Sequence, residues 1–170
     1  MEKVAFISGA NRGIGFETSK KLAEKGIKVI LGSRDMDKGK KALEELAAQG
    51  IEADLIQYDA ADLEAPQKVY DYISEKYNKL DILVNNAGFV IYGKVEELSI
   101  EDIESQMQTN YFGTINCTKY FLPHFLKQNS GHMVNVASVG GSFGVPGIAS
   151  YCATKFALLG FSEGLHHELY

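Results

Sequence analysis

The stretch Ser8-Gly9-Ala10-Asn11-Arg12-Gly13-Ile14-Gly15 decides the fold. It follows an apolar, strand-like run at residues 4–7 and opens an amphipathic run at residues 13–26. Glycine can turn the chain with positive φ, and it lets the backbone approach a ligand closely. A helix that begins here directs free N–H groups and the positive end of its dipole at an anion. The G-x-x-x-G-x-G spacing therefore predicts a pyrophosphate-binding turn between a strand and a helix.

Two alternatives compete with this interpretation of the glycines. An ordinary glycine-rich turn between a strand and a helix contains the same residues without any ligand. A P-loop would end in Gly-Lys-Ser or Gly-Lys-Thr, which this stretch does not. The position directly after the first apolar run favours a dinucleotide-binding turn.

The rest of the chain alternates short apolar runs with longer amphipathic ones. This pattern predicts parallel strands joined by right-handed crossovers, with helices on both faces of the sheet. We expect a doubly wound α/β sheet of the Rossmann type, forming a single dinucleotide-binding domain over residues 1–170. Strands are expected at 4–7, 29–31, 52–57, 82–84 and 133–136, and helices at 13–26, 36–49, 64–77, 99–128 and from about 150 onward.

Local residue choices set expectations for helix ends and loops. Asp35 is interpreted as an N-cap, and Ser99 with Asp102 as a variant of the capping box that opens the long helix. Pro123 is expected to kink or interrupt that helix. Residues 139–147 contain four glycines and a proline, which predicts a mobile loop.

Composition excludes several classes of function. The net charge is −5 and the isoelectric point is about 5.4, so neither a nucleic-acid partner nor an anionic membrane surface is expected. No apolar run approaches the roughly 20 residues that cross a bilayer, and no signal peptide is recognisable, so we expect a cytoplasmic protein. Cys117 and Cys152 are expected to be buried thiols. The histidines lack the spacing of metal ligands, so no metal site is expected.

The residues at the ends of the expected strands suggest which cofactor is bound. Ligands of such sheets bind beyond the carboxyl ends of the strands, here Ser8, Ser33, Asp59, Asn85 and Ser138. Where a ribose-binding carboxylate would indicate NAD, the chain has Ser33 and Arg34, and Arg12 lies within the glycine turn. Two guanidinium groups suit a 2′-phosphate, which favours NADP over NAD. The alternative is that both arginines are surface residues, as we also expect for the lysine-rich helix face at 38–41.

Tyr151 and Lys155 are the candidate catalytic pair. Side chains four residues apart share one face of a helix, and a nearby ammonium favours the phenolate. The tyrosine would then serve as a general acid or base, although any helix can contain this pair by chance. Ser138 lies thirteen residues earlier and can hydrogen-bond a carbonyl oxygen. Asn110 lies in the middle of a predicted helix, where asparagine is unfavourable and its amide is expected to have a hydrogen-bond partner. The alternative is that the amide is solvated or bonded locally.

Taken together, these residues resemble the short-chain dehydrogenase/reductase family. The glycine turn matches its cofactor motif, Asn85-Asn86-Ala87-Gly88 its N-N-A-G segment, and Asp59 the acid that contacts adenine. Asn110, Ser138, Tyr151 and Lys155 match its catalytic tetrad. The cofactor-binding residues that the resemblance implies are Gly9, Asn11, Arg12, Gly13, Ile14, Gly15, Arg34, Asp59, Ala60, Asn86, Ala87, Gly88, Tyr151 and Lys155.

The resemblance implies hydride transfer between NADP(H) and a small-molecule carbonyl or secondary alcohol. Tyr151 would exchange a proton with the substrate oxygen, which Ser138 would hold. Lys155 would bind the nicotinamide ribose and favour the phenolate of Tyr151, and Asn110 would keep a water in a proton relay to Lys155. With NADPH as cofactor, ketone reduction is the favoured direction.

The resemblance also shows a departure from the family at the C-terminal end. Family members usually continue with a sixth strand, a substrate-covering helical segment and a last strand, which do not follow Tyr170 here. A fragment and a short form are both consistent with this. A non-catalytic, self-associating NADP-binding domain is therefore the alternative function. The family often dimerises, so we expect a homo-oligomer through the helices at about 99–128 and 150–169.

Overall fold

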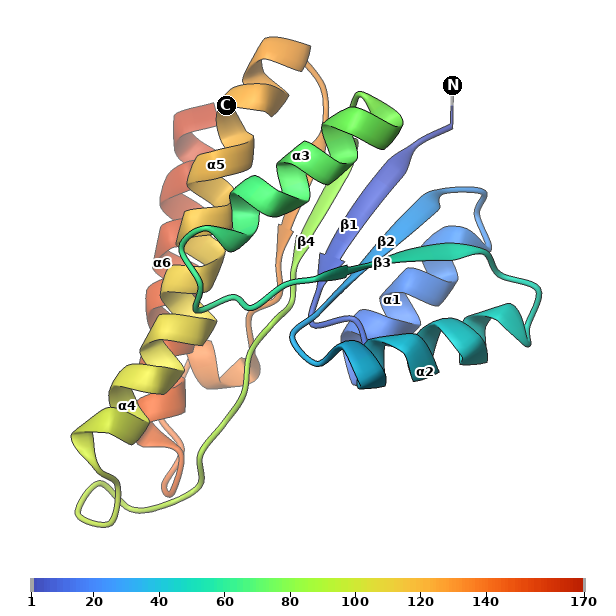
Figure 1. Cartoon of the computed structure of the whole chain (residues 1–170). Helices are drawn as coiled ribbons and strands as arrows, with labels where there is room; N and C mark the ends of the chain where they lie inside the picture. Colours follow the sequence, from blue (N-terminus) through green and yellow to red (C-terminus); the bar gives the residue numbers. More distant parts are fainter. Residues whose placement is uncertain (1, 170) are drawn as a thin grey trace.

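The computed structural model describes residues 2–169, which contain a five-stranded parallel sheet in the order β3–β2–β1–β4–β5 (Figure 1). After β3 the chain crosses over to place β4 on the other side of β1, so the strand order reverses beside β1. A reversal of this kind opens a ligand crevice at the carboxyl ends of the strands. The strands are β1 (Val4–Ser8), β2 (Lys28–Ser33), β3 (Ala53–Gln57), β4 (Ile82–Asn85) and β5 (His132–Asn135).

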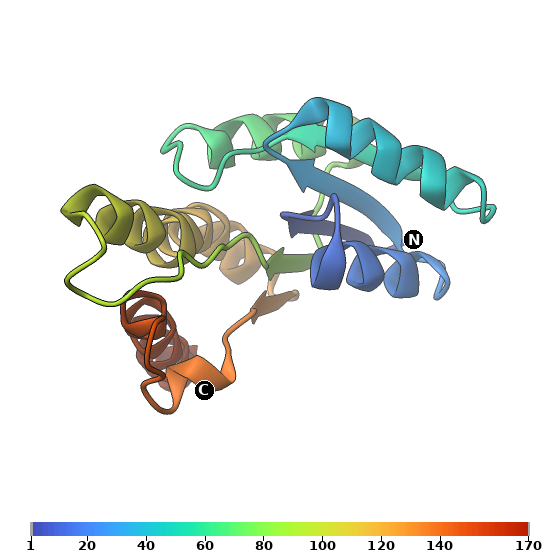
Figure 2. The same ribbon diagram turned by 90° about the horizontal axis from the view of Figure 1, so that it is seen from below.

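Helices cover both faces of the sheet, as Figure 2 shows when the molecule is seen from below. On one face lie α1 (Gly13–Ala23) and α2 (Met36–Ala47). On the other face lie α3 (Ala65–Tyr77) and the long helical column of α4 (Ile100–Met107) and α5 (Gly113–Gln128), with α6 (Ala149–Leu169) beside them. This arrangement confirms the predicted doubly wound, Rossmann-type fold.

Alternate residues of β1 build the two halves of the core. Val4 and Phe6 join a buried cluster under α3 and α5, whereas Ala5 and Ile7 join a cluster under α1 and α2. Burial on both faces explains why the central strands are apolar nearly throughout. The outer strands β3 and β5 are less completely buried.

The predicted helix caps are confirmed. The Asp35 carboxylate accepts hydrogen bonds from the backbone N–H groups of Asp37 and Lys38 and so begins α2. Ser99 and Asp102 form a complete capping box at the start of α4, where each side chain accepts a hydrogen bond from the other residue's backbone N–H. Cys117 and Cys152 are both buried free thiols, as expected.

The long helix departs from the prediction at Pro123. It runs without interruption through Pro123, and its irregularity lies instead in a π-helical segment, η1 (Gln108–Phe112), between α4 and α5. Proline withholds the hydrogen bond that the carbonyl group four residues earlier would accept. That carbonyl belongs to Lys119, which is exposed, so water can bind it and the helix continues.

The glycine-rich loop at 139–147 also differs from the prediction in its first part. It begins with a short 3₁₀ helix, η2 (Val139–Gly141), in which Gly140 and Gly141 are buried. A Cβ added at Gly141 would lie 2.8 Å from the Lys155 carbonyl oxygen. Glycine at this position therefore lets the loop pack directly on the backbone of α6. Across residues 2–169, no helix combines the length and apolar character needed to span a membrane.

Candidate functional site

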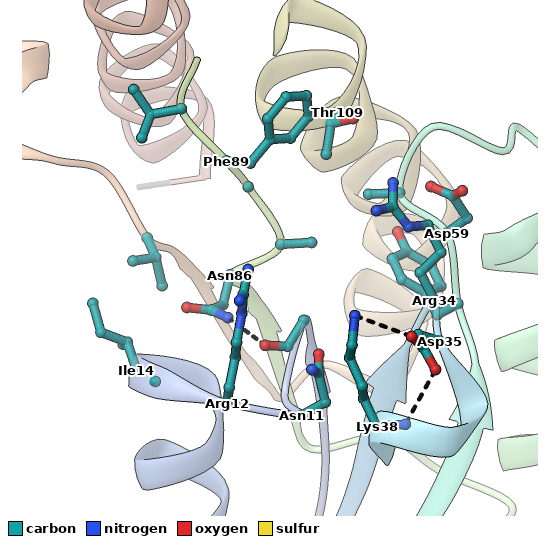
Figure 3. Close-up of a pocket in the computed structure, with 18 of the residues that line it drawn as sticks. Asn11, Arg12, Ile14, Arg34, Asp35, Lys38, Asp59, Asn86, Phe89 and Thr109 are labelled. Atoms are coloured by element: carbon teal, nitrogen blue, oxygen red, sulfur yellow. Dashed lines mark hydrogen bonds and ion pairs between the residues drawn. The ribbon is translucent and has the colours of Figure 1, made fainter. Parts of the chain in front are cut away.

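A cavity of about 510 Å³ opens at the carboxyl ends of the strands (Figure 3). Its wall includes residues that follow each of the five strands, namely Gly9, Arg34, Asp59, Asn86 and Val136. The other lining residues are Asn11, Arg12, Gly13, Ile14, Asp35, Lys38, Tyr58, Ala60, Ala87, Gly88, Phe89, Val90, Thr109, Ala137, Tyr151 and Lys155. The structure thus brings every predicted cofactor residue except Gly15 to the wall of one cavity.

Gly15 lies behind the cavity and shapes the glycine turn from within. A Cβ added there would lie 2.6 Å from the carbonyl oxygen of Gly9 and 2.5 Å from Nδ2 of Asn86. Gly9 itself has a φ of +64°, which an L side chain rarely adopts. The turn can therefore be this tight only with glycine at both positions.

The start of α1 leaves its backbone donors free of side-chain caps. Arg12 is the N-cap residue, and its side chain makes no capping hydrogen bond. The first N–H groups of a helix have no partner within the helix, and they attract anions. This end of α1 faces the cavity through Gly13 and Ile14, so the turn fits a pyrophosphate.

Asn86 and Ser8 connect the glycine turn to the end of β4. Nδ2 of Asn86 donates hydrogen bonds to the carbonyl oxygens of Ser8 (2.9 Å) and Gly9 (3.2 Å). Oγ of Ser8 accepts from the backbone N–H groups of Asn86 (2.9 Å) and Ala87 (3.0 Å). The side chain of Asn85 instead points to Thr118 and Asn135, away from the cavity. Of the two asparagines, Asn86 is the one that braces the turn.

Three basic side chains line the cavity. Figure 3 shows Arg12 on the side of the glycine turn, and Arg34 with Lys38 on the side of β2. Nζ of Lys38 lies 3.1 Å from the Asp35 carboxylate. The backbone N–H and the ammonium of Lys38 together hold the pKa of Asp35 below its usual value. Lys38 is exposed, as predicted for the helix face at 38–41, and from the first turn of α2 it also lines the cavity.

Tyr151 and Lys155 meet at the other end of the cavity. Nζ of Lys155 lies 5.8 Å from the centre of the Tyr151 ring and donates a 2.8 Å hydrogen bond to the carbonyl oxygen of Val136. Lys155 is only 5% exposed, and burial lowers the pKa of its ammonium group. The predicted sharing of one helix face is therefore confirmed, with the phenol and the ammonium group both at the wall.

Asn110 lies behind this end of the cavity rather than in its wall. It is fully buried on η1, where its Oδ1 accepts from the N–H of Phe89 (2.9 Å). Its Nδ2 donates to the carbonyl oxygen of Phe89 (2.8 Å) and to Oγ1 of Thr154 (3.2 Å). The expectation that this amide needs partners is confirmed, and those partners lie on distant segments.

Ser138 lies near Gly140, as Tyr151 does, but it does not end a strand as predicted. Strand β5 stops at Asn135, and Oγ of Ser138 accepts a 3.1 Å hydrogen bond from the N–H of Gly140. A Cβ added at Gly140 would lie 3.5 Å from Oγ of Ser138 and 3.6 Å from Cε1 of Tyr151. The two hydroxyl-bearing side chains therefore flank Gly140, and glycine keeps the space between them open.

Several cavity residues were not singled out from the sequence. Val136 and Ala137 follow β5, so the rule that ligands bind beyond strand ends would have found them had the strand end been placed correctly. Lys38 lies in the first turn of α2, which starts directly after the end of β2, and could have been found from that position. Phe89, Val90 and Thr109 carry no comparable pattern in the sequence.

A sequence model described as short chain dehydrogenase matches residues 3–170. The chain belongs to the short-chain dehydrogenase family.

Relatives and solved structures of this family agree with the fold. The chain is 40% identical over 163 residues to an uncharacterized oxidoreductase of Thermotoga maritima, covering 96% of this chain and 64% of that protein. A short-chain dehydrogenase/reductase of Burkholderia phymatum, solved in complex with NAD, superposes with a TM-score of 0.94 at 32% identity, covering 98% of this chain and 60% of that one.

An actinorhodin polyketide ketoreductase, solved with NADPH, gives the same TM-score of 0.94 at 34% identity, covering 99% of this chain and 65% of that one. The chain thus spans between 60% and 65% of the length of these three proteins. Their complexes support a nicotinamide cofactor in this family and include both NAD and NADPH.

Proposed function

We propose that this chain is the cofactor-binding and catalytic part of an NADP(H)-dependent oxidoreductase acting on a carbonyl or secondary alcohol. We also propose that residues 1–170 form one dinucleotide-binding domain. The observation that carries the proposal is one cavity with a glycine turn at one end and the Tyr151–Lys155 pair at the other. An anion site and a proton-exchange site in one space are what hydride transfer from a dinucleotide requires.

The residues of the cavity fit a dinucleotide along its length. The turn Gly9–Gly15, with Asn11, Arg12, Gly13 and Ile14, would hold the pyrophosphate at the uncapped start of α1. Asp59 and Ala60 would contact the adenine side, and Asn86, Ala87 and Gly88 would follow the cofactor toward Tyr151. When bound, the cofactor supplies or accepts the hydride at the substrate carbon.

Preference for NADP over NAD is supported by three basic side chains in the cavity wall. It is also supported by Asp35, whose carboxylate is already bound to other groups of the protein. Arg12, Arg34 and Lys38 all line the cavity, and arginine pairs bidentately with phosphate. Asp35, the carboxylate closest to the end of β2, caps α2 and pairs with Lys38. It is therefore engaged elsewhere and poorly suited to bind a ribose hydroxyl.

The acid–base roles follow from the chemistry of the four predicted catalytic residues. Tyr151 gives a proton to the substrate oxygen in reduction and takes it back in oxidation, while Ser138 holds that oxygen. Lys155 binds the nicotinamide ribose, and its Nζ lies 5.8 Å from the centre of the Tyr151 ring on the same face of α6. We assign Asn110 to keeping a water in a proton relay toward Lys155, from a π-helical segment of the kind often found at functional sites.

Fluorescence titration and turnover together test this proposal. NADPH and NADH are titrated into the purified chain, and NADPH oxidation is then followed with a panel of ketones and aldehydes. We expect tighter binding of NADPH and turnover of at least one carbonyl. The Tyr151→Phe variant should lose about 100-fold or more in kcat at unchanged NADPH affinity. Tyr70→Phe, which removes a phenol on α3 outside the cavity, is the matched control.

A non-catalytic, self-associating NADP-binding domain is the second candidate, because the cavity residues that would hold the dinucleotide do not by themselves require turnover. Binding of NADPH without turnover, unaffected by Tyr151→Phe, would support this candidate against the enzyme. An absence of binding would contradict both.

A homo-oligomer through the helices at about 99–128 and 150–169 belongs to the same proposal. Large apolar side chains are exposed on these helices, including Phe112 (45%), Leu126 (59%) and Phe156 (45%). Burial of such side chains against a second copy would stabilise an assembly. Light scattering should give a mass of at least twice 18.7 kDa, and a monomer would contradict this part. The two unpaired thiols are consistent with the cytoplasmic location that we propose.

A further inference from the structure

Gln106 is a fully buried glutamine on α4, outside the cavity and outside the predicted tetrad. Its Oε1 accepts a 3.0 Å hydrogen bond from the N–H of Ile91. Its Nε2 donates to Oγ of Ser150 at 2.8 Å and to the carbonyl oxygen of Asp102 at 3.4 Å. Burying a glutamine is costly unless its amide is paired, and here both ends of the amide have partners.

The contacts of Gln106 repeat those of Asn110 one helical turn away. Both amides accept a backbone N–H from the segment after β4, at Ile91 and at Phe89 respectively. Both donate to a hydroxyl on α6, at Ser150 and at Thr154 respectively. The partners on α6 are also one turn apart, so the two amides form a ladder with two rungs between the same three segments.

The two hydroxyl partners of this ladder lie next to Tyr151 and Lys155 in the sequence. Ser150 directly precedes Tyr151, and Thr154 directly precedes Lys155. Ser150 is the second residue of α6, in the first turn, where the backbone N–H groups have no partners within the helix. First turns fray readily, so the position of Tyr151 depends on what holds this turn. The hydrogen bond from Gln106 to Ser150 joins the first turn of α6 to α4. The hydrogen bond from Ile91 to Gln106 joins the segment at residues 89–91 to the same helix.

We infer that Gln106 is a positioning residue for the acid–base step, fixing the first turn of α6 and hence the Tyr151 hydroxyl relative to the segment at residues 89–91. The inference rests on the proposed function, because it deepens the role of Tyr151. Gln106 does not face the cavity, so its effect on the reaction passes through Ser150 and Ile91.

Three variants test the inference in the full chain. Gln106→Leu removes the hydrogen bonds to both Ile91 and Ser150 while keeping similar volume and helix propensity. Ser150→Ala removes only the bond to α6 and is mild enough to fold where Gln106→Leu does not. Ser105→Ala is the matched control, since its hydroxyl bonds only to the Asp102 carbonyl of its own helix.

Two readouts separate a positioning role from a structural one. We expect Gln106→Leu to lose about 10- to 100-fold in kcat, because a displacement of about 1 Å costs on the order of 100-fold. Its NADPH dissociation constant should stay within about threefold of the unmodified value. Ser150→Ala should lose part of this rate and add nothing when combined with Gln106→Leu, since the two remove one contact. Hydrogen exchange should be faster in peptides that cover the start of α6 in both variants, and unchanged in Ser105→Ala.

The outcomes are distinguishable. A folded Gln106→Leu protein with an unchanged kcat, or with unchanged exchange at the start of α6, overturns the inference. Faster exchange without a fall in kcat also overturns it, because the contact is then structural only. If the unmodified chain binds NADPH but reduces no carbonyl, the proposed function fails, and the exchange measurement still decides whether Gln106 fixes α6.

Discussion

Replacing Gly15 with alanine perturbs the glycine turn from inside the protein, without touching the cavity. The added Cβ would lie 2.6 Å from the Gly9 carbonyl oxygen, whereas ordinary contacts of a Cβ begin at 3.4 Å. The carbonyl must therefore retreat by about 0.8 Å, the difference between these two distances. Nδ2 of Asn86, at 2.5 Å from the same Cβ, must also move, and it braces the Gly9 carbonyl. The substitution thus displaces the turn at the point where we propose that the pyrophosphate binds.

The size of this displacement sets the expected effect on NADPH binding. A hydrogen bond to a charged group contributes about 1.5–3 kcal/mol. If the shifted turn loses one such bond to the pyrophosphate, we expect the NADPH dissociation constant to rise about 10- to 100-fold. Overpacking at a buried site also costs about 1–3 kcal/mol of stability, so the melting temperature should fall.

Fluorescence titration of NADPH and a thermal melt measure both effects. Gly164→Ala is the matched control: Gly164 lies on the exposed side of α6, and a Cβ there meets nothing within 4 Å. It should bind NADPH normally and gain roughly 0.5–1 kcal/mol of stability from helix propensity. A folded Gly15→Ala protein that binds NADPH within threefold of the unmodified chain would refute the assignment of the turn to the pyrophosphate.

Three further predictions address specificity, stability and reactivity. Arg34→Ala should weaken NADPH binding about tenfold or more while changing NADH binding little, and equal losses for both would contradict a 2′-phosphate contact at Arg34. Burial opposes ionisation of Asp54, but hydrogen bonds from Lys76, Tyr77 and Tyr72 outweigh it and lower the pKa of Asp54. Its contribution to stability is therefore present above the unfolded pKa of about 3.9 and lost as pH falls through the lower folded value. Asp54→Asn should accordingly reduce the melting temperature at pH 7 but much less at pH 2, and a difference independent of pH would contradict this. Burial raises the pKa of the Cys117 thiol to about 12, so iodoacetamide should label Cys117 only after unfolding, as mass spectrometry of digested protein would show.

Much of the fold could be predicted because its signals are local. The alternation of apolar and amphipathic runs predicts the order of strands and helices, and capping residues such as Asp35 and Ser99 act within one turn of their own position. The Tyr151–Lys155 spacing likewise needs only the period of a helix. Each of these inferences depends on residues close together in the chain.

The features that were not predicted depend on residues far apart in the chain. Pro123 is tolerated because Lys119 lies on an exposed side of α5, which the sequence does not state. Gly140 and Gly141 are buried because α6 packs on them, although glycine-rich stretches usually indicate loose loops. Lys38 lines the cavity because α2 starts beside the end of β2, although its side chain is as exposed (65%) as that of Lys40.

Polar side chains hold the irregular segment after β4 by accepting hydrogen bonds from its backbone N–H groups. Residues 86–99 leave β4 without helix or strand structure, so their backbone N–H groups have no regular partners and need other acceptors. Short polar side chains supply them: Oγ of Ser8 for residues 86 and 87, and the amides of Asn110 and Gln106 for residues 89 and 91. Ser8 directly precedes the glycine turn, and the two amides also donate hydrogen bonds to hydroxyl groups on α6. One irregular segment is thereby fixed against the proposed pyrophosphate site at one end and the acid–base pair at the other. Preorganisation of this kind follows from satisfying buried backbone groups, and it explains why a glutamine on an ordinary helix can matter to a reaction that it does not touch.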